Sequence, residues 1–105
     1  MIIKREQAKI YLIKGSILRR TYIGKIDHKV YIRYIRIEQP PCEIIFHDVT
    51  LDVIKYKEVK PTLNGYEYTS GLERSYFTNE LFNGKIELLY YPIQEVFIKP
   101  DEFEI

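Results

Sequence analysis

The sequence has no tryptophan, a single alanine (Ala8) and a single cysteine (Cys42). One cysteine cannot form an internal disulfide, which excludes a disulfide-stapled scaffold and fits a reducing compartment. Alanine is the best helix former, so its near absence argues against a helical protein. No apolar run approaches the ~18 residues of a membrane span, and the start of the chain lacks the apolar core of a secretory signal. We therefore expect a cytoplasmic protein with no membrane segment.

Catalytic and metal-binding motifs are also missing. The five glycines are scattered singly, and there is neither a glycine-rich phosphate loop, nor a zinc spacing of Cys or His, nor a Gly-x-Ser-x-Gly elbow. Asp48 and Asp52 would lie about 13 Å apart along a strand, too far for a pair of glycosidase carboxylates. We therefore expect no catalytic residue, no metal and no cofactor. A small enzyme with a dispersed site stays open as an alternative.

What is abundant is isoleucine and tyrosine, with seventeen and ten residues. Branched and aromatic side chains suit a pleated, half-buried surface and are mediocre in helices. Signals for turns recur about every ten residues, which is typical of a sandwich or barrel. The intervening runs predict strands at residues 9–14, 17–26, 30–38, 43–47, 50–59, 65–69, 85–91 and 94–99.

The apolar pattern changes phase inside two of these strands. In residues 30–37 it passes from Val30 and Ile32 to Ile35 and Ile37, and a similar change occurs in residues 50–59. A one-residue change of phase indicates a β-bulge, and bulges bend strands. We therefore predict one all-β domain over residues 1–105, a small bent-strand barrel or compact sandwich. A short helical or loop insertion is expected near residues 70–83, with Thr78 as its cap.

Charge is divided unevenly along the chain. Residues 1–39 hold ten Lys/Arg and three Asp/Glu, a net of +7, while residues 40–105 hold six and twelve, a net of −6. Segregated charge of this kind creates a surface field that selects partners. The basic half is also interleaved with tyrosines, which can stack on unpaired bases while Lys and Arg neutralise phosphates.

These observations favour a non-enzymatic protein-interaction or assembly module that pairs with its own copies through faces of opposite charge. A small viral or mobile-element protein would fit this description. The alternative is a nucleic-acid-binding barrel that uses the basic half, although strong overall basicity is missing. The candidate basic-face residues are Arg19, Arg20, Tyr22, Lys29, Tyr31, Arg33 and Arg36, and the candidate acidic-face residues are Glu87 and Glu95.

Overall fold

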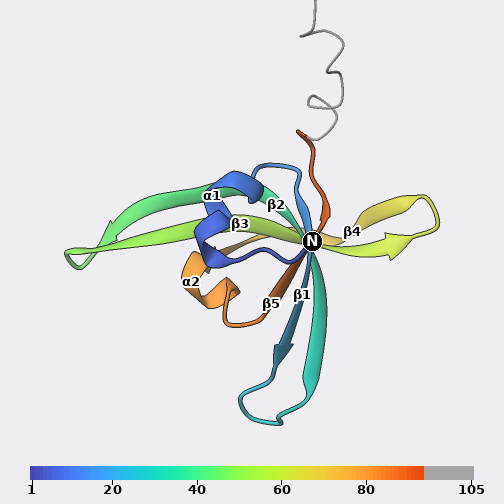
Figure 1. Ribbon diagram of the computed structural model, residues 1–105, viewed down its shortest axis with the longest axis horizontal. Helices are drawn as coiled ribbons and strands as arrows, with labels where there is room; N and C mark the ends of the chain where they lie inside the picture. Colours follow the sequence, from blue (N-terminus) through green and yellow to red (C-terminus); the bar gives the residue numbers. More distant parts are fainter. Residues whose placement is uncertain (94–105) are drawn as a thin grey trace, which may run out of the picture.

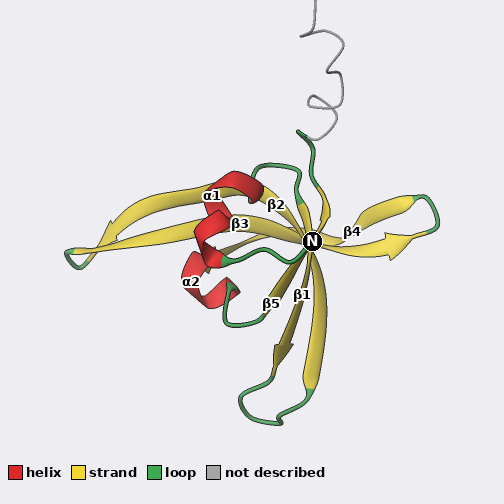
Figure 2. Cartoon of the chain, in the orientation of Figure 1, coloured by secondary structure: helices red, strands yellow, loops and turns green. Residues whose placement is uncertain are grey.

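The computed structural model describes residues 1–93, which form five β-strands and three short helical turns. The strands are β1 (Ile17–Ile23), β2 (Val30–Phe46), β3 (Val49–Thr62), β4 (Gly65–Phe77) and β5 (Lys85–Tyr90). The helical turns are η1 (Arg5–Gln7), α1 (Ala8–Tyr11) and α2 (Thr78–Leu81). The longest strand has 17 residues and the longest helix has four, so the expected all-β class is confirmed (Figure 2).

The strands form one antiparallel sheet in the order β4-β3-β2-β1-β5. Within residues 1–93 the two outer strands, β4 and β5, do not pair with each other. The sheet is therefore not closed, and the barrel expected from the bent strands is not confirmed. The edge of β5 is covered by the start of the chain, because Ile3 donates a hydrogen bond to Ile86 O at 2.9 Å and Leu88 donates to Met1 O at 2.7 Å.

The strand β2 is longer than the sequence predicted because it continues through Pro40 and Pro41. The register between β2 and β3 shifts between Ile37 and Gln39 and again between Gln39 and Cys42. Proline lacks an N–H to donate to a ladder, and a bulge is one of the few places where a strand tolerates it. The bulge expected within residues 30–37 is therefore found further along, at residues 37–42, where it joins the strands predicted at residues 30–38 and 43–47 into one.

The insertion expected near residues 70–83 is mostly strand. Tyr68 lies opposite Val59 and Glu73 lies opposite Lys57, so the extra residues of β4 form an irregularity around Gly71, whose φ is +69°. Beyond it, β4 pairs again with β3 as far as Phe77. Only α2 is helical in this stretch. Its N-cap is Phe77 rather than Thr78, and no side chain caps it.

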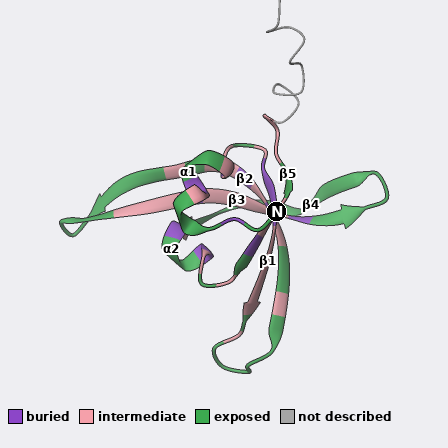
Figure 3. Cartoon of the chain, viewed as in Figure 1, coloured by how far each residue is buried: buried purple, intermediate pink, exposed green. Residues whose placement is uncertain are grey.

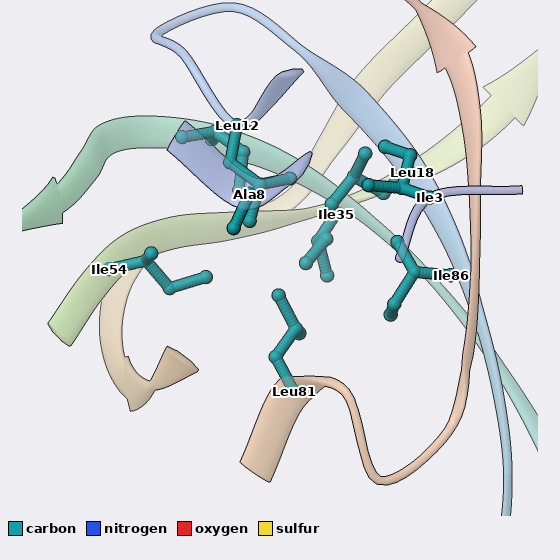
Figure 4. Close-up of a cluster of buried hydrophobic side chains, with 9 residues drawn as sticks. Ile3, Ala8, Leu12, Leu18, Ile35, Ile54, Leu81 and Ile86 are labelled. Atoms are coloured by element: carbon teal, nitrogen blue, oxygen red, sulfur yellow. The ribbon is translucent and has the colours of Figure 1, made fainter. Parts of the chain in front are cut away.

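The core lies between one face of the sheet and the helical turns (Figure 4). Ala8 and Leu12 are four residues apart and lie on one side of the turn formed by α1, where both are buried. The strand predicted at residues 9–14 is therefore wrong: residues 9–11 belong to α1, and residues 12–14 are neither helix nor strand. The other core residues are Ile3, Leu18, Ile35, Ile37, Ile54, Leu81 and Ile86.

Three hairpins extend away from this core in different directions, as Figure 1 shows. The molecule measures 56 × 41 × 24 Å, and its radius of gyration is 15.5 Å, against about 13 Å for a compact domain of this length. Burial is concentrated at the centre, and the hairpins are mostly exposed (Figure 3). No helix within residues 1–93 is both long enough and apolar enough to cross a bilayer.

Candidate assembly surface

The three hairpins are two-stranded ribbons that project from the sheet. The β1–β2 ribbon covers residues 22–33, because β1 pairs with β5 only as far as Thr21 and β2 pairs with β3 only from Tyr34. By the same criterion the β2–β3 ribbon covers residues 43–52 and the β3–β4 ribbon covers residues 60–67. We call them the basic, acidic and neutral arms. A two-stranded hairpin without further cover is only marginally stable in water.

The basic arm has an apolar face and a charged tip. Ile23 and Val30 lie directly opposite each other, and Ile32 lies two residues further along the same face. All three are more than half exposed, and Ile26 at the tip is 96% exposed. The arm contains Lys25, Lys29 and Arg33 against Asp27, a net of +2.

The tip of the basic arm is held by Asp27. Its carboxylate accepts hydrogen bonds from the Tyr31 hydroxyl and from the backbone N–H of Lys29, the latter at 3.1 Å. These bonds favour the ionised form, so the pKa of Asp27 lies below its usual range, with Tyr31 as the larger cause. The same bond raises the pKa of Tyr31. The negative charge at this tip is therefore engaged within the turn, whereas Lys25 and Lys29 are exposed.

The acidic arm has the same design with the opposite charge. It turns at His47 and Asp48, whose φ values of 49° and 62° are those of a tight two-residue hairpin turn. Phe46 opposes Val49 and Ile44 opposes Leu51, which places four apolar side chains on one face. Glu43 opposes Asp52 on the other face. The arm contains no Lys or Arg, so Glu43, Asp48 and Asp52 give it a net of −3.

The neutral arm carries one cation and one anion that pair with each other. Lys60 opposes Glu67, and their charged atoms are 3.1 Å apart. Tyr66 of this arm and Tyr68, which follows the arm in β4, lie on the same face of the strand, and both are about two-fifths exposed. This arm therefore presents apolar groups without a net charge.

The sheet separates the predicted basic residues onto two faces. Arg20, Tyr22, Tyr31 and Arg33 share the face that carries the core, because Arg20 opposes Arg33 and Tyr22 opposes Tyr31. Tyr22 and Tyr31 stack with ring centroids 5.4 Å apart, and the Arg20 guanidinium lies 4.3 Å from the Tyr22 ring centroid.

The two arginines of this group are occupied within the chain. Arg20 donates to the carbonyl oxygens of Leu81 and Glu80, each at 3.0 Å, and so ties α2 to the sheet. Arg33 donates to Glu58 at 2.7 Å and to the Tyr22 hydroxyl at 3.1 Å. Their cationic groups thus already have acceptors.

The remaining predicted residues lie elsewhere. Arg19 and Arg36 are on the opposite face, where Arg19 pairs with Glu87 and Arg36 pairs with Glu38. Burial works to raise the pKa of Glu38, but hydrogen bonds from Arg36 and Tyr68 outweigh it and hold the pKa below its usual range. Lys29 is at the tip of the basic arm, and Glu95 lies outside the described residues.

Two of the hollows on the surface of the described chain lie beside the arms. One, of about 290 Å³, lies above the buried Ile17 and Val59 and is bordered by Arg36 and three tyrosines. The other, of about 530 Å³, lies at the base of the acidic arm and is lined mainly by Ile44, Val53, Tyr76 and Phe77. Residues 1–93 contain no group of three or more His, Cys, Asp or Glu that could hold a metal ion.

Sequence reasoning missed the exposed apolar faces of the arms. Alternation in residues 44–51, interrupted by the polar pair His47 and Asp48, is a signal for a hairpin with one apolar face. Alternation alone does not say that this face stays uncovered. No protein-family model matches the chain, and comparisons with curated proteins and with solved structures found no match.

Proposed function

We propose that this chain is a non-enzymatic assembly module that associates with its own copies through its arms. The observation that carries the proposal is the set of large apolar side chains left exposed on two-stranded ribbons. Exposed apolar residues gathered in this way are characteristic of interaction sites. An assembly that covers them would also stabilise hairpins that are marginal on their own. The exposed apolar residues of the basic and acidic arms are Ile23, Ile26, Val30, Ile32, Ile44, Ile45, Phe46 and Val49.

Charge supports the same proposal, but the charges that matter are those of the two arms and not those of the whole basic and acidic halves of the sequence. The ion pairs Arg19–Glu87 and Arg33–Glu58 join the basic half to the acidic half within one chain. They reduce the charge available for partners near the centre of the sheet. The charges of the basic and acidic arms take part in none of the described ion pairs except through Arg33. A cytoplasmic protein of viral or mobile-element origin fits this proposal.

The second candidate is binding of single-stranded nucleic acid. It is favoured by the stacked rings of Tyr22 and Tyr31 beside Arg20, since aromatic rings next to cations can stack with bases. It is disfavoured by the contacts of Arg20 and Arg33, which already have acceptors within the chain. Binding would have to rely on the lysines of the basic arm.

Light scattering of the purified chain tests the proposal. We expect a mass above the 12.7 kDa of one chain at high micromolar concentration and low salt, decreasing when salt is raised because exposed charges are screened within about 8–10 Å. A mass of one chain under all these conditions would contradict the proposal. If that single chain bound a random single-stranded oligonucleotide with a steep dependence on salt, the nucleic-acid function would replace it.

A further inference from the structure

The basic and acidic arms each have an exposed apolar face, and their charges are complementary. Each presents apolar side chains on one face, and their net charges are +2 and −3. Two basic arms brought together would repel, and so would two acidic arms. Unlike arms attract, which steers encounter and fixes which surfaces meet. Complementarity of charge therefore selects the acidic arm as the partner of the basic arm.

The apolar face of the acidic arm continues into a recess. Along β3, Val49, Leu51 and Val53 alternate onto one face, and Val53 lies opposite Phe77 of β4. Val53 and Phe77 also line the hollow of about 530 Å³. A row of apolar side chains thus runs from the tip of the arm to a hollow at its base.

The tip of the basic arm has a side chain suited to this hollow. Ile26 is 96% exposed and lies between Lys25 and Asp27 in the turn. With Ile26 in the hollow, the tip lysines Lys25 and Lys29 would lie near Glu80, which lines the hollow together with Lys55, while Glu43 and Asp52 lie on the other face of the arm. The attraction between the arms thus comes from the net charge of −3 on the acidic arm, which acts across a two-stranded ribbon within the roughly 8–10 Å over which charges still interact at physiological salt.

The two arms of one chain cannot make this contact with each other. Figure 1 shows that the β1–β2 and β2–β3 hairpins leave the core in different directions. We infer that the basic arm of one copy docks on the acidic arm of another, with Ile26 in the hollow at its base. The contact joins two different surfaces, so it generates a reciprocal pair, a closed ring or an open filament of copies. This inference rests on the proposed function and adds the identity of the contacting surfaces.

Exchanging the charges of the two arms tests the pairing. Lys25→Glu with Lys29→Glu changes the basic arm from +2 to −2, and Glu43→Lys with Asp52→Lys changes the acidic arm from −3 to +1. Asp48 is left in place because its φ of 62° is unfavourable for lysine. Each double variant alone has two arms of like charge, whereas a mixture of the two variants offers unlike arms.

We expect each double variant alone to associate at least about tenfold more weakly than the wild type, and an equimolar mixture to recover association. A matched control exchanges the neutral arm's pair, Lys60→Glu with Glu67→Lys, and should associate like the wild type. Circular dichroism of each variant verifies folding. Ile26→Ser supplies a second test, because this exposed tip residue makes no contribution to the core, and it should weaken association.

The outcomes separate this inference from the proposed function. A wild type that remains a single chain overturns both. A wild type that associates, together with folded double variants that associate equally well alone, overturns the arm pairing and leaves the assembly function standing. If the equimolar mixture of the two double variants stays dissociated, the arm pairing is likewise overturned and the assembly function stands.

Discussion

At the scale of single residues, two buried hydroxyls of the described chain differ in whether they have a hydrogen-bond partner. Ser16 is fully buried and donates to the carbonyl oxygen of Tyr11 at 2.6 Å. Thr78, which is 2% exposed, has a hydroxyl oxygen with no partner. A buried polar group without a partner costs about 1–3 kcal/mol, whereas a satisfied one stabilises the fold. The two positions should therefore respond to removal of the hydroxyl with opposite sign.

We predict that Thr78→Val raises the free energy of unfolding by about 1 kcal/mol, because the methyl group needs no hydrogen bond. The matched variant Ser16→Ala should lower the free energy of unfolding by about 1 kcal/mol, since it removes a hydrogen bond and leaves the Tyr11 carbonyl without that donor. Urea unfolding followed by circular dichroism measures both. A destabilised Thr78→Val would mean that its hydroxyl has a partner after all.

The candidate site could be predicted only in part at this scale. Adjacent strand residues point to opposite faces, so the separation of Arg19 from Arg20 follows from the sequence once the strand is known. The opposition of Arg20 with Arg33 depends on the hairpin register, which the loop of residues 24–29 sets. Arg20 also donates to the carbonyl oxygens of Glu80 and Leu81, which are 60 and 61 positions further along the chain. No local sequence pattern encodes a contact over that separation.

At the scale of elements, the attachment of β5 to β1 depends on a close approach at Gly84. A Cβ on this residue would lie 2.6 Å from the backbone oxygen of Thr21 and 3.0 Å from the Cβ of Tyr22. Backbone cannot move aside without disturbing the pairing of Thr21 with Lys85. At Gly24, by contrast, the atoms in the way belong to the side chains of Asp27 and Tyr31, and those chains can rotate.

We predict that Gly84→Ala lowers the free energy of unfolding by about 1–3 kcal/mol, the usual cost of inserting a methyl group where there is no room. Gly24→Ala should cost less, because displaced side chains at an exposed tip relax more easily than backbone. Thermal and urea unfolding of the two variants compare them directly. Equal losses at the two glycines would show that the approach at Gly84 is not close.

The sequence predicted the hairpins better than it predicted their lengths. The gaps between the predicted strands at residues 27–29 and 60–64 indicate turns, and the chain reverses at both. Pro40-Pro41 and Ser70-Gly71 are also turn signals that end predicted strands, but in the structure both are irregularities inside continuous strands. A turn and a bulge use the same residues, and which one forms depends on whether a neighbouring strand is present to continue the pairing. That neighbour is far away in the sequence.

At the scale of the whole molecule, stability is distributed unevenly between the centre and the arms. The core residues come from both ends of the described chain and from the middle of the sheet, while residues 22–33, 43–52 and 60–67 bury little. Amides in such ribbons are hydrogen-bonded, but they open locally at small free-energy cost. The arms should therefore be the parts whose stability depends most on a partner.

We predict that hydrogen exchange in the basic and acidic arms slows as the protein concentration rises, by at least about tenfold in rate for amides of residues 43–52. Exchange in the neutral arm serves as the internal control and should change little, because this arm carries no net charge and takes no part in the inferred contact. Amides between β1 and β5 should be protected at every concentration, since they surround the core. Mass spectrometry of peptides from each arm measures the exchange rates at dilute and at high micromolar concentration. The three arms are compared with one another within each sample. Protection of all three arms that did not depend on concentration would contradict assembly as the source of their stability.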